Sequence, residues 1–197
     1  MVSVFSRFGI WVRANPLRVF SVVLVLAAVS GVAAYAYLQL LKPQAGPRAT
    51  ITSPPIEFSM EMDKTEFTQG ENVTIRLSLK NIGNETIGLR WADFYPYMDE
   101  VMYFDFIIAD ENNTQVYQWT REHGSLQAVL IRTLNHSEQL ISIYPWYQRY
   151  GYLDGGEAQV PKGTYYVKGL TRKVGLTVGD QTSVITLETP TITIIVK

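Results

Sequence analysis

The strongest constraint on the fold is a period-two alternation of apolar and polar residues in the part of the chain beyond residue 55. Between residues 72 and 82 every second position from Val73 to Leu79 is apolar, with polar residues in between, and residues 56–62 repeat the pattern. Neighbouring side chains of a strand point to opposite faces of a sheet. The alternation therefore predicts strands that bury one face in an antiparallel sheet.

Nine short segments have strand character, and turns rich in Gly, Asn, Asp and Pro separate them. No convincing amphipathic helix stands between them. Such a chain is predicted to form an all-β domain built as an antiparallel two-sheet β-sandwich. The predicted strands are residues 56–62, 72–82, 86–91, 101–109, 115–119, 139–144, 164–170, 183–188 and 191–196.

An uncharged apolar run from Val19 to Leu41 precedes this domain. As a helix rising about 1.5 Å per residue it would span roughly 34 Å, enough to cross the hydrocarbon core of a bilayer. We therefore predict one N-terminal transmembrane helix at residues 19–41. A cleaved signal peptide is the alternative, because Ala34 and Ala36 resemble an export cleavage site. The remaining predicted parts are a cytoplasmic or interfacial segment (1–18), a Pro-rich stalk (42–55) and an ectodomain (56–197).

Two signals predict that this domain lies outside the cell. Arg7, Arg13 and Arg18 precede the apolar run, which favours a cytoplasmic N-terminus and a single-pass cell-membrane protein. Beyond the run, four of six asparagines begin an Asn-x-Ser/Thr triplet, the acceptor pattern for N-glycosylation. The alternative is that polar turns simply combine Asn, Ser and Thr. The predicted glycosylation sites are Asn72, Asn84, Asn112 and Asn135.

Composition argues against several classes of function. Beyond the apolar run the chain has 14 basic against 18 acidic side chains, so it offers no basic surface for nucleic acid. The absence of cysteine excludes thiolate nucleophiles and Cys-ligated metals. The two histidines, His123 and His136, lie in no HExxH motif, and the chain has no GxSxG motif. We therefore predict no enzymatic activity, no catalytic residue and no cofactor.

Two acidic positions allow more than one interpretation. Asp110, Asn112 and Thr114 alternate like the ligands of a calcium loop, but a hairpin turn explains them equally well, and we predict no metal site. Asp105 stands between Phe104 and Phe106 in a predicted strand. It either faces solvent or accepts hydrogen bonds from a neighbouring loop.

Five aromatic residues crowd the segment from Tyr144 to Tyr152, beside Arg149. Aromatic and Arg side chains clustered on a loop are typical of binding patches. The alternative is a packed lid over one end of the sandwich. We expect Trp146 to be buried in the core and the tyrosines after it to be exposed. The predicted binding residues are Tyr147, Arg149, Tyr150 and Tyr152, joined by Tyr95 and Tyr97.

Three stretches resemble the BsuPI family, which is named for an intracellular proteinase inhibitor of a bacillus. Residues 67–91 have a Gly-containing turn, a strand, an Asn-containing turn and another strand. Residues 103–119 contain a Tyr-Asp-Phe strand, an acidic turn and a strand ending in Trp, and residues 160–170 contain a Pro-x-Gly-Thr-Tyr strand. The resemblance spans about 105 residues. It implies an immunoglobulin-like β-sandwich and proteinase inhibition.

The leading functional prediction is a membrane-anchored, non-enzymatic cell-surface module that binds an unknown protein or glycan through loops of the sandwich. The first alternative, which follows from the resemblance, is an inhibitor of an exported proteinase. The second is a structural subunit that associates laterally. Small residues at Ala27 and Gly31 of the predicted anchor, or strand addition by the β-prone tail at residues 191–197, would support such association.

Overall fold

The computed structural model describes residues 46–92, 95–97, 100–123, 128–152, 156 and 158–197. Residues Ala45–Lys197 form a compact unit of their own. The predicted membrane helix from Val19 to Leu41 and the predicted segment 1–18 lie outside the described residues. Within the described part, no helix has the length and apolar character needed to cross a membrane.

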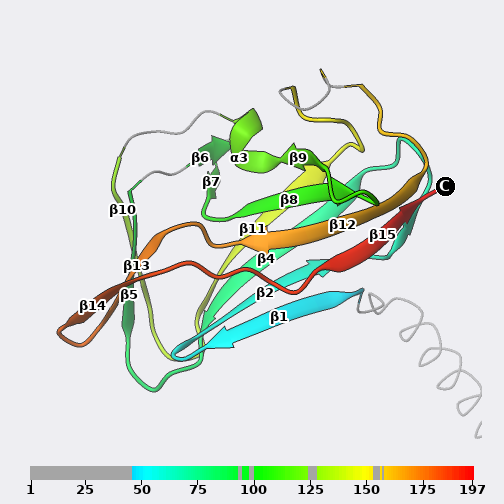
Figure 1. The fold of residues 1–197 in the computed structure, drawn as a ribbon. Coiled ribbons are helices and arrows are strands. Elements are labelled where there is room, and N and C mark those ends of the chain that lie inside the picture. Colours follow the sequence, from blue (N-terminus) through cyan, green and yellow to red (C-terminus); the bar gives the residue numbers. More distant parts are fainter. Residues whose placement is uncertain (1–45, 93–94, 98–99, 124–127, 153–155, 157) are drawn as a thin grey trace, which may run out of the picture. The chain divides into compact units, whose positions relative to one another are not determined.

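Three main sheets and a two-stranded hairpin form the described fold (Figure 1). Sheet A has the order β1 (Arg48–Ser53), β2 (Ile56–Met62), β4 (Val73–Asn81) and β11 (Gln139–Trp146). Sheet B has the order β3 (Glu66–Phe67), β15 (Ile192–Val196), β12 (Gly163–Leu170), β8 (Asp105–Asp110) and β9 (Gln115–Gln118). Sheet C has the order β10 (Leu130–Leu134), β5 (Ile87–Trp91), β13 (Val174–Val178) and β14 (Gln181–Ile185). The hairpin pairs β6 (Tyr95–Tyr97) with β7 (Glu100–Met102), and the short helix α3 (Trp119–Glu122) follows β9.

The predicted all-β, antiparallel architecture is confirmed. All strand pairs are antiparallel except the short parallel pairing of β3 with β15. Along β4 the alternation read from the sequence becomes alternate burial, with Val73, Ile75, Leu77 and Leu79 fully buried. These side chains belong to one hydrophobic core to which sheets A, B and C all contribute.

Sheets A and B pack face to face, which confirms the β-sandwich. The rings of Phe58 in β2 and Phe104 just before β8 lie 5.2 Å apart between centroids. Gly169 of β12 marks the closest approach, because a Cβ atom there would lie 2.5 Å from Cδ2 of Leu77 in β4. Any larger residue here would force the Leu77 side chain to move.

A buried asparagine fixes the corner where the chain passes from sheet A to sheet C. The Asn81 amide Nδ2 donates to the backbone carbonyls of Glu85 (2.8 Å) and Leu134 (3.0 Å), and Oδ1 accepts from the Gly83 N–H (2.9 Å). One side chain thus satisfies polar backbone groups of the β4–β5 turn and of the end of β10.

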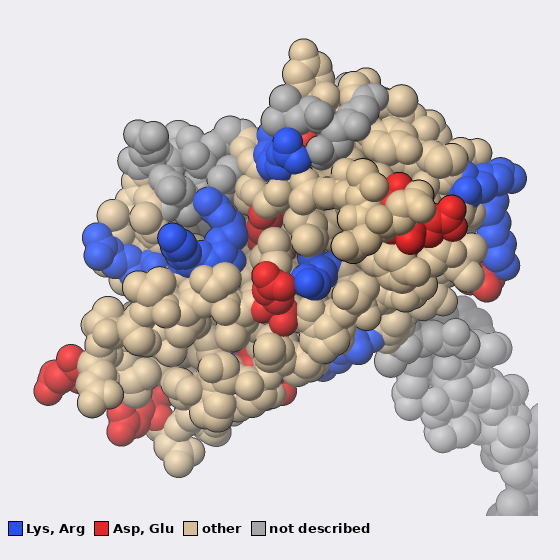
Figure 2. Space-filling view, in the orientation of Figure 1, with Lys and Arg blue, Asp and Glu red and all other residues tan. Residues whose placement is uncertain are grey.

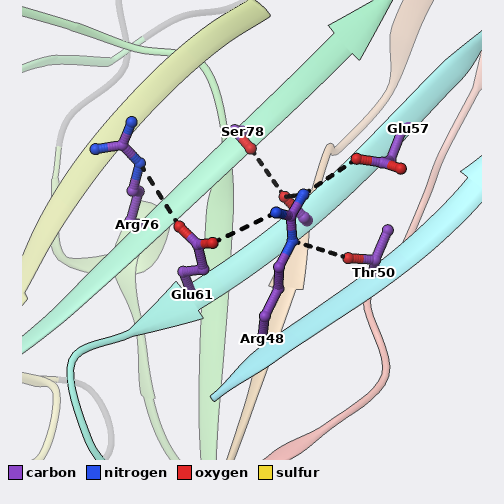
Figure 3. A network of polar contacts seen from close by, with 7 residues as sticks. Arg48, Thr50, Glu57, Glu61, Arg76 and Ser78 are labelled. Atoms are coloured by element: carbon purple, nitrogen blue, oxygen red, sulfur yellow. Dashed lines mark hydrogen bonds and ion pairs between the residues drawn. The ribbon is translucent and has the colours of Figure 1, made fainter. Parts of the chain in front are cut away.

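The predicted stalk at residues 42–55 is wrong from residue 48 onward, because Arg48–Ser53 form the edge strand β1 of sheet A. Figure 3 shows Arg48 reaching across β2, where its guanidinium contacts Glu57 at 3.1 Å and Glu61 at 3.5 Å. Arg76 of β4 contacts the same Glu61 at 3.9 Å. Pairing with β2 satisfies the backbone of a segment whose prolines had suggested an extended, unpaired chain.

Several strand predictions also need correction. β1, β3, β6, β10 and β13 were not predicted, and β14 runs over Gln181–Ile185 where residues 183–188 were expected. In β10 the exposed Ile131 follows the half-buried Leu130, so apolar residues on both faces hide the period of two. In β13 the apolar residues Val174, Leu176 and Val178 do stand at every second position, and this short strand was overlooked. The predicted strand 101–109 divides into β7 and β8.

Candidate functional site

The aromatic segment begins where β11 ends, and the alternation of β11 decides which rings are buried. Tyr144 and Trp146 point into the core and are almost completely buried, as expected for Trp146. The Tyr144 hydroxyl donates to the Phe104 carbonyl (2.7 Å) and accepts from the Phe104 N–H (3.0 Å), which joins β11 to the chain entering β8. Burial raises the pKa of the Tyr144 phenol well above its usual range, so this group stays protonated and serves the structure.

Gln148 holds the loop after β11 in place. Its backbone is in the left-handed region (φ 55°) and its side chain is fully buried. The side-chain amide donates to the Thr68 carbonyl (2.9 Å) and accepts from the Gly70 N–H (2.8 Å). The Gln148 carbonyl in turn accepts from the Gln159 side chain (2.7 Å) and the Val160 N–H (2.9 Å). Three separate segments therefore meet at this one residue.

Asp105 positions the other side of the site. Its Oδ1 accepts from the backbone N–H groups of Phe106 (2.9 Å) and Thr120 (3.1 Å). Its Oδ2 accepts from the Gln118 amide and the Thr120 hydroxyl, both at 2.7 Å. The carboxylate is 1% exposed, so the solvent-facing interpretation is wrong and the structural one is confirmed. These bonds attach the start of α3 to β8.

The short helix α3 carries the ring pair that borders the site. The His123 imidazole stacks on the Trp119 indole with 3.7 Å between centroids, and its Nδ1 lies 2.9 Å from the Trp119 carbonyl. The Glu122 carboxylate accepts the Tyr152 N–H at 2.7 Å. α3 and the loop after β11 are thereby connected directly.

Between these elements lies a cleft of about 530 Å³, which we call the aromatic cleft. Its walls combine flat rings with charged and amide groups. Arg149 and Gln159 are exposed, whereas the Trp119 ring is buried beneath the surface. The ring-bearing residues of the lining are Tyr117, Trp119, His123, Trp146, Tyr147 and Tyr150.

The structure brings three of the predicted binding residues together in the aromatic cleft: Tyr147, Arg149 and Tyr150. Tyr147 is 55% exposed, as predicted. The expectation that Tyr150 is exposed is wrong, because its ring is partly buried and packs against the core. Tyr152 is 71% exposed but does not line the cleft. Tyr95 and Tyr97 lie in β6, and the positions of their side chains are outside the described part of the structure.

Sequence reasoning missed Gln148, Gln159 and Glu122 as parts of the site. No local pattern marks them, because each acts on a segment distant in sequence. The Tyr-Asp-Phe stretch indicated that Asp105 could have a structural role. That Asp105 bonds to Thr120 and so holds α3 became visible only in the structure.

The predicted glycosylation sites, Asp110 and His136 do not line the aromatic cleft. The four predicted glycosylation sites are exposed and lie in turns or at strand boundaries. At the third of them, Asp110 Oδ1 accepts from the N–H groups of Asn112 (3.0 Å) and Thr114 (2.8 Å), as a hairpin turn requires. His136 Nδ1 lies 2.6 Å from the Gly83 carbonyl. Among the described residues no group of three or more metal-binding side chains is found.

The family model for BsuPI, described as an intracellular proteinase inhibitor, matches residues 60–175, more than half of the chain. The chain belongs to the BsuPI family. The matched range extends the resemblance seen in the sequence, and it contains every residue that lines the aromatic cleft. No curated protein matches this BsuPI-family chain at a significant level.

Solved structures similar to this BsuPI-family chain have low identity to it. A β-glucosidase from Erythrobacter marinus is 10% identical with a TM-score of 0.36, over 75% of this chain and 16% of the enzyme. The C-terminal domain of Wzt is 9% identical with a TM-score of 0.34, over 76% of this chain and 70% of that domain. A β-glucosidase from Listeria innocua is 13% identical with a TM-score of 0.31, over 72% and 16% of the two chains. The chain thus spans only 16% of the length of either enzyme, and these similarities carry no functional argument.

Proposed function

We propose that this chain is a non-enzymatic binding module that holds a segment of a partner protein in the aromatic cleft. The observation that carries the proposal is the exposed Tyr147 beside Arg149 at the rim of a preformed cleft. Binding pockets for small groups typically enclose about 300–1,000 Å³, a range that includes this cleft. Tyr and Arg are also the side chains that most often dominate the free energy of protein binding.

The walls of the cleft favour an extended polypeptide segment as the ligand. Rings at Tyr117 and Tyr150 offer apolar contact area, while Gln159 and Arg149 provide donors for carbonyl groups. Anchoring by Gln148 and Asp105 keeps both walls in place before binding, which reduces the entropy lost when a ligand is ordered. A glycan is the other chemistry that stacked rings and amides accommodate.

A second candidate is an inhibitor of an exported proteinase, and the family membership favours it. Every residue that lines the cleft lies within the range that matches the family model, so the proposed site belongs to the part of the chain that the family shares. In this form of the proposal the partner segment belongs to a proteinase, and binding blocks its access to substrates.

We also propose the location and the finer fold type. The uncharged run at residues 19–41 supports a membrane anchor, and the four exposed Asn-x-Ser/Thr triplets support a position on the outer cell surface. The face-to-face packing of sheets A and B supports an immunoglobulin-like fold. The N-terminus is then cytoplasmic.

The test compares three variants of the domain at residues 46–197 with the unmodified domain. Tyr147→Ala and Arg149→Ala alter the cleft, and Tyr166→Ala, which alters a partly exposed tyrosine of β12, serves as the control. Peptide and glycan arrays measure binding, and a panel of serine, cysteine, aspartic and metalloproteinases measures inhibition. We expect the two cleft variants to weaken the same activity at least about tenfold, a loss of about 1.4 kcal/mol, while Tyr166→Ala leaves it unchanged. Equal activity of all four proteins, or no activity in any assay, would contradict the proposal.

A further inference from the structure

Sheet edges expose unpaired backbone N–H and C=O groups, and natural domains protect them with charges, prolines, bulges or short strands. Five of the six edges of sheets A, B and C carry such protection. β1 begins with Arg48, β11 contains Pro145 and β10 contains Arg132. β3 has two residues, and β9 is joined to β8 through a register shift at Ile108 and Ala109.

The remaining edge strand, β14, has none of these features. Its sequence from Gln181 to Ile185 has no charge and no proline, and it pairs with β13 without a register shift. Four of its five residues are exposed, and Val184 is 72% exposed. In Figure 1 the β13–β14 hairpin projects from one end of the domain, and in Figure 2 the tip at that end shows acidic side chains and no Lys or Arg.

The geometry of the hairpin shows which backbone groups are available. A two-residue loop, Gly179 and Asp180, closes the ladder at the pair Val178–Gln181. In such hairpins hydrogen-bonded and non-hydrogen-bonded pairs alternate away from the loop. The N–H and C=O groups of Thr182 and Val184 therefore point away from β13, toward the open edge.

We propose that two copies of this chain associate by antiparallel pairing of β14 with β14, around a two-fold axis at Ser183. In this register Thr182 lies opposite Val184 of the second copy, and the two Ser183 residues lie opposite each other. Gln181 lies opposite Ile185. Sheet C then continues across the axis, and each outward backbone group of Thr182 and Val184 gains a partner.

Self-pairing is favoured because the ladder brings no like charges together and its side chains match across the axis. No charged residue lies within the five-residue ladder, and Asp180, just outside it, meets the uncharged Thr186 of the second copy. The Thr182–Val184 pairs place a β-branched residue opposite another β-branched residue, which stabilises antiparallel pairs. The C-terminal strand β15, by contrast, is already flanked by β12 and β3.

The size of the interface limits its strength. A ladder of five residues is much smaller than the roughly 20–30 residues a side of a standard interface. The dimer therefore forms weakly in dilute solution and more fully where copies are concentrated. A test by covalent trapping suits such an equilibrium.

The chain has no cysteine, so a single introduced thiol reports on one position alone. In the proposed register the two Ser183 residues form a non-hydrogen-bonded pair with Cα atoms about 4.5 Å apart, which is within the range for a disulfide. The two Gln181 residues are displaced by four residues along the strands, about 13 Å, which is beyond the roughly 7 Å limit for bridging. Both positions lie on one exposed strand and one face, so Gln181→Cys is a matched control for Ser183→Cys.

The experiment uses the full chain, mild oxidation and non-reducing electrophoresis over a range of concentrations. We expect Ser183→Cys to form disulfide dimers at least about ten times faster than Gln181→Cys, because only the Ser183 pair lies within bridging distance in this register. Ser183→Lys, which places like charges opposite each other, should lower the dimer fraction in sedimentation without changing the melting temperature. Similar dimer rates for the two cysteine variants, or no dimer with either, would overturn the proposal.

Discussion

Replacing Asp105 tests whether one buried carboxylate holds α3, and with it one wall of the aromatic cleft. The carboxylate accepts four hydrogen bonds, two on each oxygen, from Phe106, Gln118 and Thr120. Asp105→Ala removes the acceptors and leaves the donors in place. Asp105→Asn keeps the shape and one oxygen but turns the other into an amide donor.

The magnitudes follow from these bonds. A buried donor left without an acceptor costs about 1–3 kcal/mol. Asp105→Ala leaves two backbone N–H groups, the Gln118 amide and the Thr120 hydroxyl without this acceptor, although Gln118 and Thr120 are partly accessible to water. We therefore expect a loss of about 4 kcal/mol. Asp105→Asn keeps the two backbone bonds but sets its amide against the Gln118 amide, both donors, for a loss of about 2 kcal/mol.

Urea unfolding and thermal melting of residues 46–197 measure these losses. For a domain of this size 1 kcal/mol lowers Tm by about 2–4 °C, so Asp105→Asn should lower Tm by roughly 4–8 °C and Asp105→Ala by about twice as much. The tryptophan emission should also shift to the red as Trp119 becomes exposed. Asp63→Ala, at an exposed turn, is the control and should change stability by less than about 0.5 kcal/mol. Equal stability of the Asp105 and Asp63 variants would refute the assigned role.

Three further predictions concern the core, pH and topology. Trp146→Ala should lower the free energy of unfolding by about 3–5 kcal/mol, whereas Tyr147→Ala should change it by less than about 0.5 kcal/mol; equal losses in melting experiments would show that both rings are core. Burial raises the pKa of Tyr165 from 10.0 to about 12, so the folded state holds this proton more tightly than the unfolded chain. The resulting stability is fully present below pH 10 and falls as the pH rises toward about 12, and a flat urea midpoint over this interval would contradict it. Protease added to intact cells should digest the chain beyond Lys42, and complete protection would count against the predicted topology. The mass of the intact protein from a host that glycosylates should show glycans on at least two predicted sites, and a bare polypeptide would count against it. Those sites are Asn72, Asn84, Asn112 and Asn135.

Much of the candidate site could be located from the sequence, because aromatic density is a local property. The expected burial of Trp146 and exposure of Tyr147 are confirmed, and Tyr147 and Arg149 both line the cleft just after the strand that ends in Trp146. The exposure of Tyr150 could not be read in the same way. Its ring packs against the core because the loop turns back after Gln148, which has a positive φ.

The sequence alone determined the all-β class, the burial pattern of β4 and the absence of any thiol, because alternation and composition are properties of single strands and of residue counts. It also contained the signals for the BsuPI family, since these lie in short continuous stretches.

Only the tertiary structure decided where the cleft lies and which strand edge stays open. The cleft depends on Gln148 bonding to residues near position 70 and on Asp105 bonding to α3, and these partners are set by how distant segments meet. β1 became a strand because it pairs with β2, and β14 is an open edge because no other described strand pairs with it beyond β13 in sheet C. Hydrogen bonds between distant segments form only after the sheets pack, and no local sequence pattern encodes their partners.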